Sequence, residues 1–139
     1  MNIFLDANIL VAILNKEYPV FSIAARILSL ADHPKHIIYT SPVCLAIAIY
    51  FAEKKTSSIV AKNKIKILLE HIHIAENSKN AIINTLNNKK ILDFEDGLEY
   101  YSAIESNCDC IVTENLKDFH FSEIEVLDCM QFATKYFIR

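Results

Sequence analysis

The apolar positions of the chain form five short runs that alternate with longer segments of helical spacing. The runs are rich in β-branched and aliphatic residues and predict strands over residues 2–5, 36–39, 72–75, 110–113 and 124–127. In the segments between them, apolar residues recur every three or four positions, as at Val20, Ala24 and Ile27. This spacing predicts helices over residues 8–15, 20–32, 42–55, 58–71, 77–89, 94–107 and 129–137.

Strands that alternate with helices predict an α/β fold in which a parallel sheet is covered on both faces. Two helix starts are marked by capping residues: Ser41 precedes Pro42, and Asp93 precedes an acidic first turn. In such folds ligands bind beyond the carboxyl ends of the strands, where the strand order reverses. Asp6 lies at such an end, and so does the segment 113–118.

The length of the chain and the distribution of its apolar residues limit the classes of protein to which it can belong. A chain of 139 residues is predicted to form one domain over residues 1–139. The longest apolar stretch without a charge, residues 41–52, is too short to span a bilayer, and the first 15 residues lack the features of a signal peptide. We therefore expect a cytoplasmic protein with no membrane association.

Composition excludes several kinds of site. The single glycine, Gly97, excludes both the dinucleotide-binding and the P-loop glycine motifs. The four cysteines contain no C-x-x-C pair and are interpreted as free thiols. A net charge of -3 does not indicate a nucleic-acid binder by itself, although local basic patches can still bind RNA.

Acidic residues gather in three places that could meet at one edge of the sheet. Asp6 follows the first strand, Asp96 lies near the start of a helix on the same face as Glu99, and Asp118 follows the fourth strand. Each acid alone could be a helix cap or a turn residue, but together they would repel one another strongly. A cation would relieve that repulsion, and oxygen ligands favour Mg²⁺ or Mn²⁺. The chemistry indicated is phosphodiester hydrolysis.

Three stretches of the chain resemble a known family. They read FLDANILVAIL, TSPVCLAIAIYF and DFEDGLEYYSAIESNCDCIVTENLKDF. The order is similar to that of PIN-domain ribonucleases, the fold of VapC-type toxins, and most closely to the bacterial branch with DFEDAL and ITRNxKDF motifs. The resemblance covers essentially the whole chain and implies a three-layer α/β/α sandwich with a five-stranded parallel sheet and an acidic Mg²⁺ pocket.

The resemblance also implies roles for individual residues. Asp6 matches the first family acid and Asp96 the third, and both would bind the metal directly. Asp118 would bind the metal through a water molecule or orient that water, and Asn115 would contribute a neutral oxygen. Thr113 would support the last loop and contact the substrate. Independently of the resemblance, the basic side chain of Lys117 makes it a candidate for contact with the RNA backbone. These residues define a metal-dependent endoribonuclease that cleaves single-stranded RNA, with an antitoxin protein as a possible partner and a homodimer as the expected assembly.

The chain departs from the family pattern at Ile47, where family nucleases carry a glutamate. The neutral Asn115 also stands where many relatives have an aspartate. Two missing charges would weaken metal binding and slow cleavage. The alternative is therefore a catalytically degenerate PIN fold that binds RNA or a protein without cutting it.

Overall fold

The computed structural model describes residues 1–137 and contains one parallel sheet of five strands. The strands are β1 (Asn2–Leu5), β2 (Ile37–Thr40), β3 (His73–Ile74), β4 (Cys110–Val112) and β5 (Glu125–Leu127). Their order in the sheet is β3-β2-β1-β4-β5. All five predicted strands are present: the bounds of β1 are those expected, and those of the other four differ by one residue at one or both ends.

Seven α-helices connect and follow the strands within the described residues. They are α1 (Ala7–Leu14), α2 (Val20–Ser29), α3 (Pro42–Lys55), α4 (Ser58–Leu69), α5 (Lys79–Asn87), α6 (Phe94–Glu105) and α7 (Cys129–Tyr136). The predicted helix over residues 20–32 ends earlier, because its last turn is the 3-10 helix η1 (Leu30–Asp32). A second 3-10 helix, η2 (Leu116–Phe119), lies in the segment expected to be a loop.

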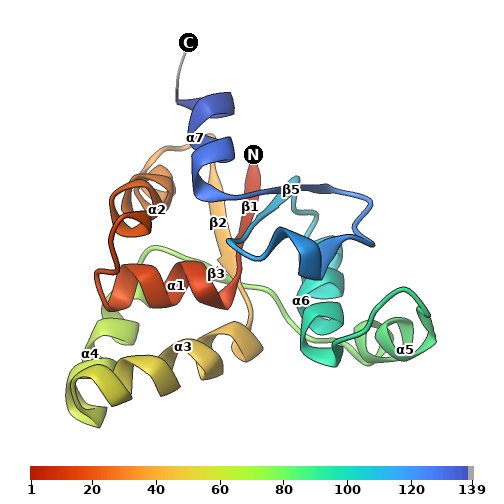
Figure 1. Cartoon of the computed structure of the whole chain (residues 1–139), viewed down its shortest axis with the longest axis horizontal. Coiled ribbons are helices and arrows are strands. Elements are labelled where there is room, and N and C mark those ends of the chain that lie inside the picture. Colours follow the sequence, from red (N-terminus) through yellow and green to blue (C-terminus); the bar gives the residue numbers. More distant parts are fainter. Residues whose placement is uncertain (138–139) are drawn as a thin grey trace.

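The helices form layers on both sides of the sheet. Helices α1 and α2 lie on one side of the strands, and α6 with α5 lies on the other (Figure 1). Helix α3 packs against α1 and continues into α4. This arrangement is the α/β/α architecture that the alternation of strands and helices predicts.

The central strands are buried on both faces, which explains why they contain no polar alternation. Ile3, Phe4 and Leu5 of β1 are fully buried, as are Ile111 and Val112 of β4. A strand covered by helices on both sides has no face that can carry polar side chains. The continuous apolar run therefore fixes β1 and β4 as the centre of the sheet.

The chain reverses its direction of travel across the sheet between β1 and β4. It moves from β1 to β2 and β3, and then crosses to the other side of β1 to form β4 and β5. The backbone N–H of Asp6 donates to the carbonyl of Val112 at 3.0 Å, so the ends of β1 and β4 are joined by a hydrogen bond. The residues that follow these two strands are consequently neighbours at the reversal point.

Two expectations about the surface and the thiols can be compared directly with the structure. No helix within residues 1–137 is both long and apolar enough to cross a membrane. The four cysteines are free and buried, as predicted.

Gly97 allows α5 and α6 to approach closely. A Cβ atom at position 97 would overlap the methyl group of Thr85 on α5 and would lie 3.1 Å from Cγ2 of Ile91. Thr85 is buried, and its hydroxyl donates to the carbonyl of Ala81 at 2.7 Å, so the side chain cannot easily rotate away. The contact explains why this position carries glycine although it lies inside a helix.

We expect Gly97→Ala to lower the free energy of unfolding by about 1–2 kcal/mol, because overpacking of about 3 kcal/mol outweighs a helical gain of about 1 kcal/mol. Urea unfolding of the variant measures this loss. In the background of Thr85→Ser, which removes the methyl group and keeps the hydroxyl, most of the loss should disappear. An undiminished loss in that background would contradict the steric explanation.

Candidate functional site

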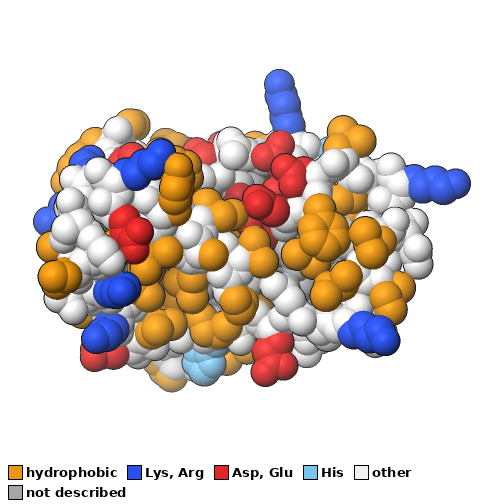
Figure 2. Space-filling model, turned by 90° about the horizontal axis from the view of Figure 1, so that it is seen from below, with side chains coloured by type: hydrophobic (Ala, Val, Ile, Leu, Met, Phe, Trp, Pro, Cys, Tyr) orange, Lys and Arg blue, Asp and Glu red, His pale blue; other side chains and the backbone are white. Residues whose placement is uncertain are grey.

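A cleft with a volume of about 460 Å³ lies at the carboxyl edge of the sheet, beside the reversal point. Seven acidic residues line it: Asp6, Glu17, Asp93, Glu95, Asp96, Glu99 and Asp118. None of the described lining residues is Lys or Arg. Acidic side chains also gather in a hollow on the face seen in Figure 2. The cleft therefore concentrates negative charge that no side chain in its wall neutralises.

Asp6 is held at the base of the cleft by three hydrogen bonds. Its Oδ1 accepts from the backbone N–H of Ala7 at 2.6 Å, which caps the start of α1. Its Oδ2 accepts from the hydroxyl of Thr113 at 2.7 Å and from the side-chain amide of Asn8 at 3.2 Å. Asp6 is buried, with an exposed fraction of only 6%, and these three donors fix the orientation of its carboxylate. The capping role and the site role therefore coexist in one side chain.

Thr113 is fully buried and lies behind Asp6. Its hydroxyl oxygen accepts from the backbone N–H of Asn115 at 3.0 Å while the hydroxyl donates to Asp6. Asn8 also contacts this loop, because its side-chain oxygen accepts from the backbone N–H of Glu114 at 3.2 Å. The position of Thr113 thus fits support of Asp6 and of the loop. It differs from the expected contact with substrate, which a fully buried side chain cannot make.

Asp96 and Asp118 face the same cleft from different elements. Asp96 lies in the first turn of α6 and is partly buried, whereas Asp118 lies in η2 and is exposed. Burial, together with the nearby charges of Asp93, Asp118 and Asp6, raises the pKa of Asp96 to about 7. The three aspartates named from the sequence therefore line one cleft.

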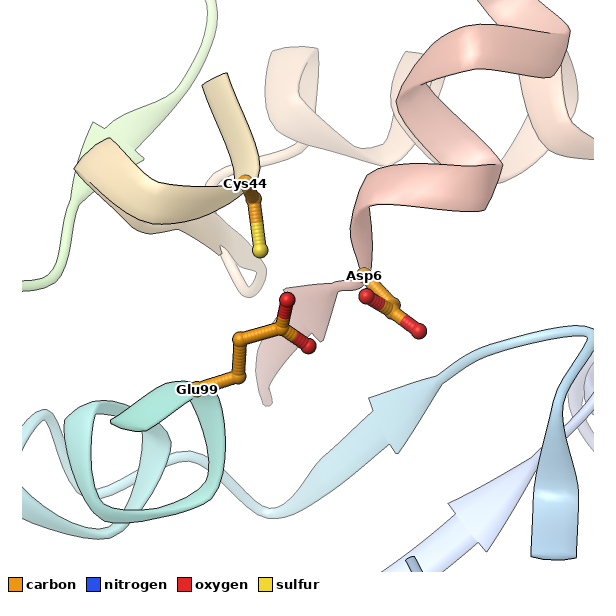
Figure 3. Close-up of side chains that lie close together, drawn as sticks. All are labelled: Asp6, Cys44 and Glu99. Carbon is orange, nitrogen blue, oxygen red and sulfur yellow. The ribbon is translucent and has the colours of Figure 1, made fainter. Parts of the chain in front are cut away.

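Glu99 is the residue that sequence reasoning did not assign to the site. It follows Asp96 by one turn of α6, and its side chain is 2% exposed. Figure 3 shows its carboxylate turned toward Asp6 and Cys44. Burial and the charge of Asp6 raise the pKa of Glu99 to about 11. The sequence signal was its position on the same face of the helix as Asp96.

The remaining predicted residues differ in their relation to the cleft. Ile47 of α3, the position at which the resemblance leads us to expect a glutamate, lines the cleft. Asn115 also lines the cleft. Lys117 is exposed on η2 and is not one of the described residues that line the cleft. Lys117 therefore lies outside the described wall of the cleft.

The donor set suits a hard divalent cation. Carboxylate and amide oxygens are the ligands that Mg²⁺ and Mn²⁺ prefer, and the cleft offers them without a competing basic side chain. The ligand atoms of Asp6, Glu99 and Cys44 lie within 4.8 Å of one another. Burial holds the pKa of the Cys44 thiol well above its ordinary value, so it remains a neutral neighbour of the carboxylates.

Comparisons with known proteins give a family match and similar structures. The sequence profile of the PIN domain matches residues 2–117. No curated protein matches the chain with significance.

Several solved structures share the fold. VapBC2 from Rickettsia felis, bound to a DNA fragment from its promoter, is 24% identical with a TM-score of 0.69 and covers 92% of this chain and 98% of its own. VapBC-1 from nontypeable Haemophilus influenzae is 20% identical with a TM-score of 0.70, covering 94% and 99%. VapC20 from Mycobacterium tuberculosis, described as a toxin that cleaves the Sarcin-Ricin loop, is 14% identical with a TM-score of 0.62, covering 78% and 86%.

The raised pKa values of Asp96 and Glu99 predict that stability falls as pH rises in the absence of divalent cations. Between about pH 4 and 7 for Asp96, and up to about pH 11 for Glu99, the folded protein retains protons that the unfolded chain has lost. Urea midpoints measured in EDTA should therefore be lower at pH 9 than at pH 5. Asp96→Asn and Glu99→Gln should each reduce the slope, and an unchanged slope in both variants would contradict the assignment.

Divalent cations should stabilise the folded protein, because they bind the cleft of the folded chain and not the unfolded chain. At a cation concentration of 100 times Kd the gain is about 2.7 kcal/mol. Thermal melts at neutral pH with millimolar Mg²⁺ or Mn²⁺ should show a higher midpoint than melts with NaCl of equal ionic strength. Asp6→Asn, which keeps an oxygen for the helix cap, should lose most of this increase. An equal thermal midpoint with Mg²⁺, Mn²⁺ and NaCl would argue against a metal site.

Proposed function

Because this chain belongs to the PIN-domain family, we propose that it is a metal-dependent endoribonuclease that hydrolyses single-stranded RNA. The observation that carries the proposal is the concentration of carboxylates at the reversal point of the sheet without a basic side chain in the described cleft wall. A site of this kind attracts a divalent cation and, through it, the phosphate of a nucleic acid. Fold and family membership narrow the reaction to nuclease chemistry.

The proposed cation ligands are Asp6, Asp96, Asp118 and Asn115, and the cation is Mg²⁺ or Mn²⁺. When bound, the cation supplies positive charge for the scissile phosphate and makes water more acidic. The protein's contribution is orientation: Ala7 N–H and the Thr113 hydroxyl fix both oxygens of the Asp6 carboxylate. A fixed carboxylate loses little conformational freedom when it binds.

The proposed contact with the RNA backbone is Lys117, which is exposed beside Asp118 on η2. The more numerous lysines of α3 and α4 are partly committed to other contacts. Lys55 donates to the carbonyl of Asn15 at 3.2 Å, and Lys64 donates to the carbonyl of Leu14 at 2.8 Å. Both therefore stabilise the end of α1, and we assign them no part in RNA binding.

A protein partner of the antitoxin class and a homodimer are part of the same proposal. Two of the similar structures are VapBC proteins by their descriptions. In this chain, large apolar side chains are exposed on α3 and α4, at Tyr50, Phe51, Ile59, Ile67 and Leu69. Exposed apolar groups of this size favour contact with a protein surface. The cytoplasm, where RNA is available, is the proposed place of action.

A second candidate function is RNA or protein binding without cleavage. Ile47 favours it, because an apolar side chain lines the cleft where family nucleases carry an acid. Under this alternative the cleft still binds a cation and RNA, but the rate of hydrolysis is negligible. The two candidates differ only in whether a labelled RNA is cut.

We expect the wild-type protein to cleave a labelled single-stranded RNA slowly in the presence of Mn²⁺ and not in EDTA. Asp6→Asn should reduce the rate by roughly a hundredfold or more, because it removes a negative oxygen from the cation site. Glu17→Gln is the matched control, since Glu17 is an exposed acid of the same cleft outside the proposed ligand set.

Cleavage that persists in EDTA or in Asp6→Asn would contradict the proposed site. RNA that is bound by the wild type with Mn²⁺ but never cut would favour the second candidate.

A further inference from the structure

Glu99 is buried in a position where its charge has no compensation from the protein. Its side chain is 2% exposed, and its Oε2 has no hydrogen-bond partner among the described residues. Its carboxylate faces Asp6, and the ligand atoms of the two residues lie within 4.8 Å of each other (Figure 3). A buried polar atom without a partner is costly and is uncommon in folded proteins.

The neighbours of Glu99 cannot supply the missing charge. Asp6 is itself an acid, and its carboxylate oxygens already accept hydrogen bonds from Ala7, Asn8 and Thr113. The described lining residues of the cleft include no Lys or Arg. Two carboxylates in this position can coexist only when a proton or a cation lies between them. A buried carboxylate oxygen without a partner, close to a second carboxylate, is therefore available to bind a cation.

Ile47 and Glu99 line the same cleft from two different helices. Ile47 belongs to α3 and Glu99 to α6, and these two helices are in contact. We propose that Glu99 is an additional direct ligand of the divalent cation, supplied by α6 in place of the acid that α3 lacks at Ile47. The proposal rests on the proposed function, because it concerns the same cation site.

An acid on α6 in place of an acid on α3 restores the number of carboxylates at the cation site but not their arrangement. With Glu99, the cation site has four carboxylates, Asp6, Asp96, Asp118 and Glu99, of which two are carried by consecutive turns of α6. Affinity for a hard cation increases with the number of charged oxygen ligands. The neutral thiol of Cys44, which lies beside both Asp6 and Glu99, is a poor ligand for such a cation and belongs to the wall.

The test is direct measurement of Mn²⁺ binding at neutral pH by the electron paramagnetic resonance signal of the free ion. We expect Glu99→Gln to weaken binding by roughly tenfold or more, because the amide keeps the size and hydrogen-bonding capacity of the side chain but not its charge. Glu95→Gln is the matched control. It removes an exposed acid of the same helix and the same cleft, and should change the affinity by about threefold or less.

The reciprocal substitution tests the exchange between the two helices. Ile47→Glu in the Glu99→Gln background returns a carboxylate to the cleft from α3, and we expect it to recover most of the lost affinity for Mn²⁺. Circular dichroism and urea unfolding verify that each variant is folded. Should Glu99→Gln fail to fold, Glu99→Asp keeps the charge but withdraws it by one methylene, and the same direction of change is expected.

The outcomes separate the inference from the proposed function. Equal affinity of wild type, Glu99→Gln and Glu95→Gln would overturn the role of Glu99 while leaving the cation site intact. Equal losses in Glu99→Gln and Glu95→Gln would reduce the effect to general charge and would overturn it as well. If Ile47→Glu recovers none of the lost Mn²⁺ affinity, the idea that Glu99 takes the place of an acid at position 47 is overturned. Absence of Mn²⁺ binding by the wild type, in the same titration, would overturn the proposed function and this inference together.

Discussion

The hydrogen bond from the backbone of Asp6 to the carbonyl of Val112 joins two strands that are far apart in the sequence, and the site depends on it. It places the residue after β1 beside the residue after β4, where the strand order reverses. The Thr113 hydroxyl then reaches Asp6, and the loop that follows Thr113 brings Asn115 and Asp118 to the same cleft. Displacement of either strand would separate Asp6 from the segment that contains Thr113 and Asp118.

The cleft is electrostatically unfavourable in the unliganded protein. Carboxylates from the β1–α1 junction, α6 and η2 share a small volume. Burial and the charges of neighbouring acids, Asp6 among them, raise the pKa values of Asp96 and Glu99. The fold tolerates this because the strands that carry the site, β1 and β4, are deeply buried in the apolar core. Part of the free energy of the apolar core is thus offset by repulsion at the carboxyl edge, which is a common arrangement where a protein binds a ligand of opposite charge.

Much of the architecture and three of the acids could be predicted from the sequence, for a physical reason. Buried strands are visible in the sequence as apolar runs, and the carboxyl ends of parallel strands share one edge of the sheet. The sequence alone therefore predicts that Asp6 and Asp118 lie at that edge. Glu99 could not be assigned, because acids near a helix start are also explained by the helix dipole, and the rotation of α6 about its axis decides which of them are buried. Thr113 was placed at the correct strand end, but its full burial depends on how tightly β4 meets Asp6.

Asp96 and Glu99 belong to one rigid helix, and Gly97 lies between them. An α-helix moves as a body, so these two side chains keep a fixed spacing and shift together whenever α6 slides or tilts on the sheet. The seating of α6 is set on its other side by the close approach of Gly97 to Thr85. Through this contact, α5 influences how far Asp96 and Glu99 extend toward Asp6, although Thr85 is not among the described residues that line the cleft.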